Sequence, residues 1–382
     1  MAKKRTFSPQ EKLIQVFLSI LAGCVTLTEV NSKLHLEVHL ASLWGWEKFA
    51  DQSTLSRTLD ALSLKQIDVL RSAVTEIWRN IGQTPKHDWR SYLWLDYDLS
   101  PLPCGKQAEG SQKGYCGRKN ATGRQLARVS AVRYRETIWS DVFPGNFHTV
   151  HCFQPAILAT EIALDLAERQ RKRTVWRLDG GSGSEEKLRW LLRRNYHVVA
   201  KGMNHNRAKS LSRKVLRWDE YRDAKLGEVP GPHDYPQPVR VFVKERREND
   251  KIIHSYYIST LPTASKRLFL QDYDARGAAE VEQFRNDKQG LALAARNKRD
   301  FLGQKAYVLL NDLAHNVLAD FQHRALKDSP CSDFSSKRII RDLISIPGYL
   351  SFRDEKLEKV SLLSLKQFSE PMQHALLRYI SD

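Results

Sequence analysis

Four side chains suited to phosphate and metal chemistry lie within residues 271–290, QDYDARGAAEVEQFRNDKQG. Tyr273, Arg276 and Glu280 are three and four positions apart, a spacing that places side chains on one face of a helix. Lys288 follows eight residues after the glutamate. A carboxylate can bind a divalent cation, while guanidinium, ammonium and phenol groups can hold a phosphate. The helix face therefore suits a reacting phosphodiester, although the same spacing occurs on ordinary solvated helices.

Two aspartates lie on an expected strand further upstream. Residues 91–100, SYLWLDYDLS, alternate as a β-strand does, with Asp96 and Asp98 on the same face. Asp98 is nearer the carboxyl end of the strand and the following loop, residues 101–123, which is rich in Gly, Lys and Arg. Functional carboxylates in α/β sheets lie at such strand ends.

A third acid, Asp179, ends a second expected strand. The stretch TVWRLDGGSGS at residues 174–184 is an apolar strand that ends on this aspartate, turns through glycines and opens a helix. The glycines lack the GxxxxGK[ST] pattern, which excludes a nucleotide-binding phosphate loop. Carboxylates that converge on hard divalent cations are what two-metal phosphoryl transfer requires, so Asp98, Asp179 and Glu280 are candidate ligands.

The composition favours a protein that binds a polyanion. The chain has 382 residues, 61 Lys and Arg against 44 Asp and Glu, and a formal net charge of +17, which makes nucleic acid the first candidate ligand. Five widely spaced cysteines form no C-x-x-C pair and predict reduced thiols in the cytoplasm. The apolar run at residues 13–25 is interrupted by polar residues, so we expect neither a signal peptide nor a membrane partner.

Residues 1–85 are expected to form an all-helical domain. Ser8 and Pro9 have the types found at a helix start, and a further helix is expected at residues 63–80. The segment DQSTLSRTL at residues 51–59 is similar to a helix-turn-helix recognition helix that would present Arg57 to DNA, although a purely structural helix has the same pattern.

The rest of the chain alternates strands and helices. Strands are expected at residues 125–134, 136–142, 196–201, 239–244 and 251–260, and helices at residues 154–172, 292–299 and 303–325, followed by a tail with a helix, a hairpin near residue 355 and a last helix.

In the order of these motifs the chain resembles the bacterial insertion-sequence DDE transposases with a Tyr-Arg-Glu-Lys signature. The resemblance rests on LDYDLS, RLDGG, YDARGAAE and NDKQGL in that order, and it spans roughly residues 10 to 325. It implies an α/β fold with an RNase H-like catalytic core, a mixed sheet flanked by helices. The implied divisions are a DNA-binding domain at residues 1–85, core segments at 86–203 and 265–330, a strand-rich insertion at 204–264, and a mainly helical tail at 331–382.

The resemblance also implies roles for individual residues. Asp98, Asp179 and Glu280 would bind two Mg²⁺ ions, which Mn²⁺ could replace, and no other cofactor is implied. Tyr273, Arg276 and Lys288 would contact DNA phosphates near the transposon end. The partners would be double-stranded DNA, as transposon ends and target, and a second copy of the chain in a dimer or higher assembly, in the bacterial cytoplasm at the nucleoid.

Three positions stay open at this stage. Asp96 competes with Asp98, but a short hydroxyl-bearing stretch follows Asp98. Glu282 competes with Glu280, yet only Glu280 lies four residues after the arginine and seven after the tyrosine. The family's lysine follows the glutamate by seven positions, where this chain has an aspartate, so Lys288 departs from the signature.

The function expected from the sequence is DNA transposition. The chain would bind terminal inverted repeats, hydrolyse the phosphodiester at the 3′ ends and join the freed 3′-hydroxyl to target DNA. The alternatives are a non-catalytic DNA-binding protein or repressor derived from a transposase, and an RNase H-fold nuclease without strand transfer. A pure binder gains nothing from three carboxylates beside phosphates, which favours an enzyme.

Overall fold

Five helices form the first part of the chain in the computed structural model, which describes residues 7–116, 119–249, 251–262, 265–354, 356–363 and 367–381. Their bounds are Pro9–Leu21 (α1), Val30–Lys33 (α2), Val38–Ser42 (α3), Gln52–Asp60 (α4) and Leu64–Ile81 (α5). Ser8 begins α1 with a capping box, because its hydroxyl accepts from the Glu11 amide while the Glu11 carboxylate accepts from the Ser8 amide. The predicted helix starts are confirmed.

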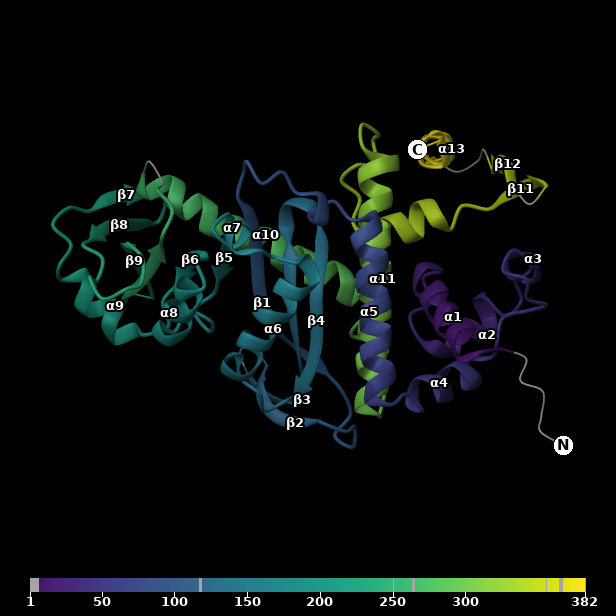
Figure 1. Cartoon of the computed structure of the whole chain (residues 1–382), viewed down its shortest axis with the longest axis horizontal. Coiled ribbons are helices and arrows are strands. Elements are labelled where there is room, and N and C mark those ends of the chain that lie inside the picture. The colour runs from purple at the N-terminus through teal and green to yellow at the C-terminus, as the bar shows by residue number, and fades with distance from the viewer. Residues whose placement is uncertain are drawn as a thin grey trace.

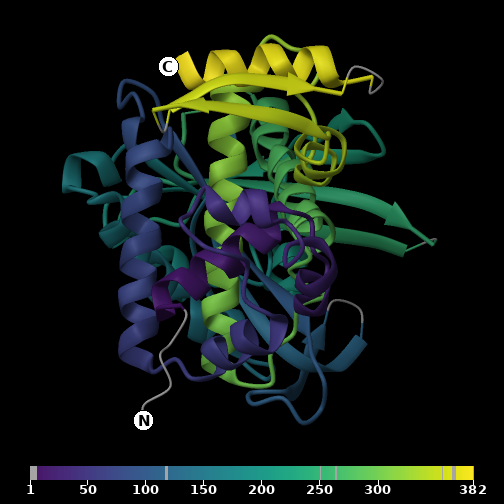
Figure 2. The same cartoon turned by 90° about the vertical axis from the view of Figure 1, so that its right-hand side faces the viewer.

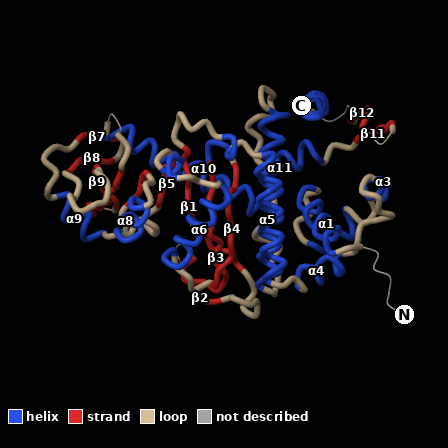
Figure 3. The backbone as a smooth tube through the Cα atoms, viewed as in Figure 1, coloured by secondary structure: helices blue, strands red, loops and turns tan. Residues whose placement is uncertain are grey.

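A mixed β-sheet extends from the middle of the molecule to its left-hand side in Figures 1 and 3. Over the described residues its order is β2-β3-β1-β5-β6-β10-β9-β8-β7, and β4 also pairs with β3. Strands β1, β5 and β6 are parallel to one another, whereas β1, β3 and β4 form antiparallel pairs. The strand bounds are Leu93–Pro103 (β1), Gln112–Cys116 (β2), Lys119–Ala131 (β3), Glu136–Pro144 (β4), Thr174–Leu178 (β5), His197–Lys201 (β6), Asp219–Tyr221 (β7), Ala224–Val229 (β8), Arg240–Glu248 (β9) and Lys251–Ser259 (β10).

The second half of the sheet comes from the segment expected to be a strand-rich insertion. Strands β7 to β10 continue the central sheet, because β10 pairs with β6 and then with β9. The long strands β9 and β10 form a ribbon that extends to one side of the molecule in Figure 2. The predicted strands at residues 239–244 and 251–260 are confirmed, and the structure lengthens the first of them.

Helices cover both faces of the sheet. Leu95 and Tyr97 of β1 are buried in an apolar cluster with helices α6 and α8, while Trp94 packs against a second cluster on the opposite face. This alternation places Asp96 and Asp98 on the second face. The helices between the strands are Thr149–Leu164 (α6), Glu168–Arg171 (α7), Glu185–Arg193 (α8) and His205–Ser212 (α9). The sequence predicted a single helix at residues 154–172, but the structure has two helices there, α6 and α7. Helix α6 ends because Asp165 adopts a left-handed conformation.

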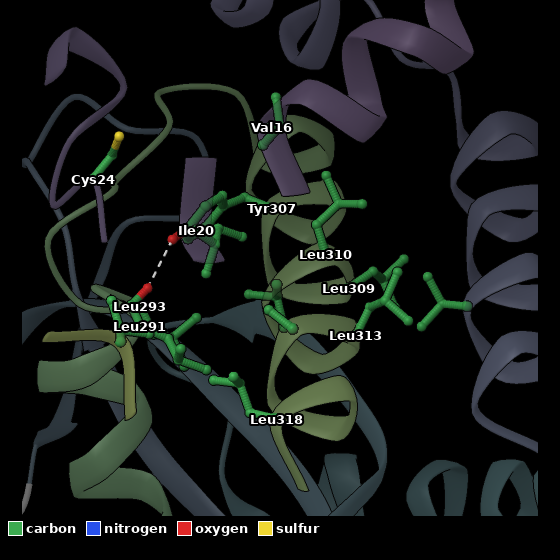
Figure 4. Packing of buried hydrophobic residues seen from close by; sticks show 14 of the residues in the cluster. Val16, Ile20, Cys24, Leu291, Leu293, Tyr307, Leu309, Leu310, Leu313 and Leu318 are labelled. Atoms are coloured by element: carbon green, nitrogen blue, oxygen red, sulfur yellow. Dashed lines mark hydrogen bonds between the residues drawn. The ribbon is translucent and has the colours of Figure 1, made fainter. Parts of the chain in front are cut away.

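Two long helices follow the sheet, Lys266–Gly290 (α10) and Phe301–Phe321 (α11). Helix α11 is buried along almost its whole length and packs against α1, α4, α5 and β4. Figure 4 shows this packing, with a hydrogen bond of 3.2 Å from the Tyr307 hydroxyl to the Leu291 carbonyl. The N-terminal helices, α11 and the tail therefore share one hydrophobic core.

One predicted helix is wrong. Residues 292–299 form turns and irregular backbone instead of a helix. Their conformation follows tertiary contacts, because the buried Arg296 guanidinium donates to the Cys24 carbonyl and to the hydroxyl and carbonyl of Ser19. The tail contains Ser336–Arg338 (α12), Gly348–Arg353 (β11), Lys356–Leu362 (β12) and Ser369–Ser381 (α13), as expected. Within the described residues no helix combines the length and the apolar character needed to cross a membrane.

Candidate active site

The register of β1 and β5 places Asp98 beside Asp179. The two parallel strands pair Asp96 with Arg177 and Tyr97 with Leu178, so the next positions along the ladder are the two aspartates. Neighbouring strands lie roughly 4.8 Å apart, and residues opposite each other project from the same face, so Asp179, directly after the last paired residue of β5, follows the ladder beside Asp98. Both side chains therefore lie on one face of the sheet, with Asp98 midway along β1 and Asp179 directly after the shorter β5. The sequence placed Asp98 close to the carboxyl end of its strand, but β1 continues to Pro103 because it stays paired with β3.

Asp96 and Asp98 share that face but have different surroundings. The Asp96 side chain is 1% exposed, and both its oxygens accept from Arg177, at 2.7 and 2.6 Å. The Asp98 side chain is 27% exposed, and its Oδ1 lies 3.8 Å from Nη2 of Arg276. Both oxygens of the Asp96 carboxylate are already bound to Arg177 in a buried bidentate pair. The geometry therefore favours Asp98 as the aspartate that binds a ligand.

The glycine loop holds Asp179 at the end of β5. Its Oδ1 accepts from the Ser182 amide at 2.9 Å, which fixes one carboxylate oxygen. A Cβ at Gly183 would lie 1.8 Å from the carbonyl oxygen of Lys201, so only glycine lets the loop pack this closely on the end of β6.

Helix α10 brings Tyr273 and Arg276 to the same acids. Besides the ion pair with Asp98, Arg276 hydrogen-bonds Tyr273, whose ring packs edge-on against Tyr257 at 4.9 Å. Burial raises the pKa of the Tyr273 phenol, so the hydroxyl stays protonated and can donate. A cation and a neutral donor thus lie beside the acid pair, as a phosphate would require.

Lys288 reaches the same strand despite its offset in sequence. Its ammonium donates to the hydroxyl of Ser100 and, at 3.2 Å, to the carbonyl of Pro101, just beyond Asp98 on β1. The preceding residue, Asp287, is fully buried and bonds to other partners. Lys288 therefore lies near the end of β1, whereas Asp287 does not take part in this contact.

Glu280 and Glu282 lie in the middle of α10. The side chains of residues 277–285 are outside the described residues, and the structure establishes the helix that carries them. The choice of Glu280 over Glu282 therefore stays a prediction from helical spacing.

Arg57 is not brought together with the acids. It is exposed on α4, among the N-terminal helices, and its guanidinium bonds to the carbonyl and hydroxyl of Ser53 one turn earlier. Its side chain is held against its own helix.

The sequence analysis missed Lys201. The parallel ladder of β5 and β6 pairs Leu178 with Ala200, so the next pair is Asp179 and Lys201. Burial lowers the pKa of Lys201, the Asp179 carboxylate opposes that shift, and neighbouring cations including Lys244 reinforce it. The sequence does contain a predicted strand that ends on Lys201, and it is the next strand after the one that leads to Asp179. The sequence does not show that these two strands pair, because pairing depends on the tertiary fold.

The donor set fits a hard divalent cation. Two neighbouring carboxylates offer the oxygen ligands that Mg²⁺ and Mn²⁺ prefer. Among the side chains that the structure describes, no three of His, Cys, Asp or Glu converge on one point.

Comparison with protein families identifies one family for this chain. A family model described as "Transposase DDE domain group 1" matches residues 144–364, which is more than half of the chain and includes Asp179 and Glu280 but not Asp98. Among solved structures, the chain is similar to the piggyBac transposase in a synaptic complex with hairpin DNA. That match has 13% identity and a TM-score of 0.48, and it covers 89% of this chain and 72% of the other. No curated protein sequence matches the chain.

Proposed function

Because the chain belongs to the family of transposase DDE domains, we propose that it is an insertion-sequence transposase. It binds the terminal inverted repeats, hydrolyses the phosphodiester at the 3′ ends, and transfers the freed 3′-hydroxyl to target DNA. The observation that carries the proposal is the pair Asp98 and Asp179, set side by side with Arg276 and Tyr273 against them.

The strand order supports an RNase H-like catalytic core within this proposal. Strands β4, β3 and β1 form an antiparallel unit, and β5 and β6 then add parallel to β1, with helices on both faces. In this arrangement β5 ends beside the middle of β1, and this supports a site shared by Asp98 on β1 and Asp179 directly after β5.

Asp98, Asp179 and Glu280 are the proposed metal ligands. When bound, divalent cations would supply the electrophile and lower the pKa of an attacking water. The chain's own residues fix the carboxylates: the Ser182 amide orients Asp179, and β1 orients Asp98.

Cations around the acids would hold the DNA backbone. Arg276 offers a planar fork and Tyr273 a neutral donor, while Lys288 and Lys201 add positive charge on either side of the acid pair. The formal net charge of +17 supports a polyanionic partner for the whole molecule.

The helices α1 to α5 would recognise the transposon end. Arg57 is exposed on α4, whose start is fixed by the Asp51 carboxylate accepting from the Thr54 amide at 2.9 Å. Joining two ends to one target requires two active sites, so we propose a dimer or higher assembly on DNA.

A cleavage and joining assay tests the proposed function. Purified chain, Mg²⁺ and duplex DNA carrying the element's ends should give 3′-end cleavage and products joined to a second DNA. Asp179→Asn should reduce the rate more than about a hundredfold, because losing a ligand exceeds the 10–100-fold cost of losing a second-shell partner. Asp165→Asn is the matched control, since Asp165 is left-handed at the end of α6, where asparagine is accommodated.

Each other outcome identifies a different protein. Cleavage without joined product would indicate a nuclease. DNA binding without cleavage, unchanged by Mg²⁺, would indicate a repressor. An Asp179→Asn variant that cleaves as fast as the parent chain would overturn the assignment of the acids.

A further inference from the structure

A buried arginine from β5 holds the first half of α10 against the sheet. The Arg177 side chain is 6% exposed, and it donates to both oxygens of Asp96 on β1. Its remaining Nη1 donates to the carbonyl of Asp272 in α10 at 3.0 Å. One guanidinium therefore ties together both strands that carry the catalytic aspartates and the helix that carries the glutamate.

A second buried arginine, from β3, holds the other half of α10. Arg128 has no exposed side-chain surface, and it donates to the Asp287 carboxylate of α10 and to Asp312 of α11, the latter at 2.7 Å. The other oxygen of Asp287 lies 2.7 Å from Nδ1 of His315 on α11. This end of the helix is therefore bound to both β3 and α11.

The two attachment points lie on either side of Glu280. Asp272 precedes it by eight residues and Asp287 follows it by seven, so the attached points span about 22 Å of helix with the glutamate near the middle. Two attachment points on one helix fix its rotation and its height above the sheet. Those two quantities decide whether a side chain at position 280 reaches Asp98 and Asp179.

Neither arginine is placed to bind DNA, because both are buried. Stability alone is a poor explanation as well, since buried ion pairs can often be replaced by apolar side chains without loss of stability. What the bidentate geometry adds is a defined distance and orientation between strand and helix.

We propose that Arg177 and Arg128 are positioning residues that set α10 so that the Glu280 carboxylate completes the metal site begun by Asp98 and Asp179. This inference rests on the proposed function. Neither arginine touches the substrate; each acts through α10.

Conservative variants separate positioning from folding. Arg177→Lys keeps the charge but loses the three-bond geometry, and Asp287→Asn keeps the shape but loses the charge. Arg194→Lys is the matched control, since Arg194 forms a bidentate pair with Glu161 of α6, away from α10. Arg177→Lys is the milder change and keeps the test open if Asp287→Asn fails to fold.

Three measurements are made on the full chain. Hydrogen–deuterium exchange reports the protection of α10 amides, Mn²⁺ electron paramagnetic resonance reports metal affinity in the complex with end DNA, and fluorescence anisotropy reports DNA affinity. We expect the Arg177 and Asp287 variants to exchange α10 amides about tenfold faster and to bind Mn²⁺ about tenfold more weakly or worse. DNA affinity should stay within about twofold, because no phosphate contact is removed.

The outcomes distinguish this inference from the proposed function. Folded variants that keep both α10 protection and Mn²⁺ affinity would overturn the positioning roles. An Asp98→Asn chain should lose Mn²⁺ but keep α10 protection, which a purely structural effect would not produce. If the parent chain binds no Mn²⁺ and cleaves nothing while the variants still loosen α10, the proposed function fails and the attachment of the helix stands.

Discussion

At the scale of single residues, the carboxylates of Asp96 and Asp98 differ in their partners and in their exposure to solvent. Asp96 is neutralised by Arg177 inside the sheet, whereas Asp98, two residues later on the same face, meets Arg276 near the surface. Sequence types alone left these two acids as rivals. The choice between them depends on Arg177, which is 81 residues away in the chain.

Lys201 gives the residue-scale prediction. If it contacts a DNA phosphate, Lys201→Ala should weaken DNA binding and reduce the slope of log affinity against log salt by about one. The control is Lys172→Ala, because Lys172 precedes β5 at the opposite end from Asp179 and pairs with Glu168 on the surface. Equal salt slopes for the Lys201 variant and the parent chain would remove Lys201 from the proposed site.

At the scale of elements, a buried network of charged side chains joins the end of α10 to β3 and α11. Within this network the protonation state of His315 is defined by its partners. His315 faces two acceptors, the Asp287 carboxylate at Nδ1 and the Arg135 carbonyl at Nε2, so both nitrogens carry protons. Burial alone would lower the pKa of His315, but the Asp287 carboxylate outweighs it and raises the pKa above the ordinary 6.5. Arg128 and Asp312 complete the network.

This protonation state predicts a pH dependence of stability. Because the folded pKa of His315 is raised, its contribution to the free energy of unfolding is fully present below about pH 6.5 and is lost as pH rises through the folded value. Denaturant titrations should show the parent chain's advantage over His315→Gln shrinking as pH rises above 6.5. His205→Gln, at an exposed position on α9, controls for loss of an imidazole. A difference that is constant or grows with pH would contradict the assignment.

Elements with strong local signals could be predicted from the sequence, and those set by distant partners could not. Alternation identified β1, and the apolar run identified β5, so the sequence placed Asp98 and Asp179 on or beside the right strands. Residues 292–299 have helix-forming composition, but the bonds of Arg296 to α1 and the turn after it override that propensity. The burial of Asp287 against Arg128 and His315 could not be predicted either, because both partners are distant in sequence.

At the scale of the whole molecule, α11 joins the parts. It lies between the N-terminal helices and the sheet in Figure 1, and it also bonds the end of α10. The helices proposed to bind the transposon end and the helix carrying Glu280 are therefore in contact with the same element. A displacement of α11 would therefore change its contacts with the N-terminal helices and with the end of α10.

The shared core predicts cooperative unfolding. Leu310 of α11 is 3% exposed, so Leu310→Ala should destabilise the chain by about 2–5 kcal/mol through lost contacts and a cavity. Because this core includes both the N-terminal helices and the tail, their unfolding should shift together in denaturant titrations followed by tryptophan fluorescence and circular dichroism. Leu216→Ala, at a fully exposed position, should leave the midpoint unchanged. Separate transitions for the two signals would contradict a single core.

The central claim is that Asp98, Asp179 and Glu280 hold a common metal, and anomalous scattering from Mn²⁺ tests it most directly. Crystals of the chain with its end DNA, grown with Mn²⁺, should show an anomalous peak bound by Asp98 and Asp179 together, with the Glu280 carboxylate among the ligands of that site. Mn²⁺ bound elsewhere, or a Glu280 side chain directed away from the two aspartates in that complex, would contradict the account.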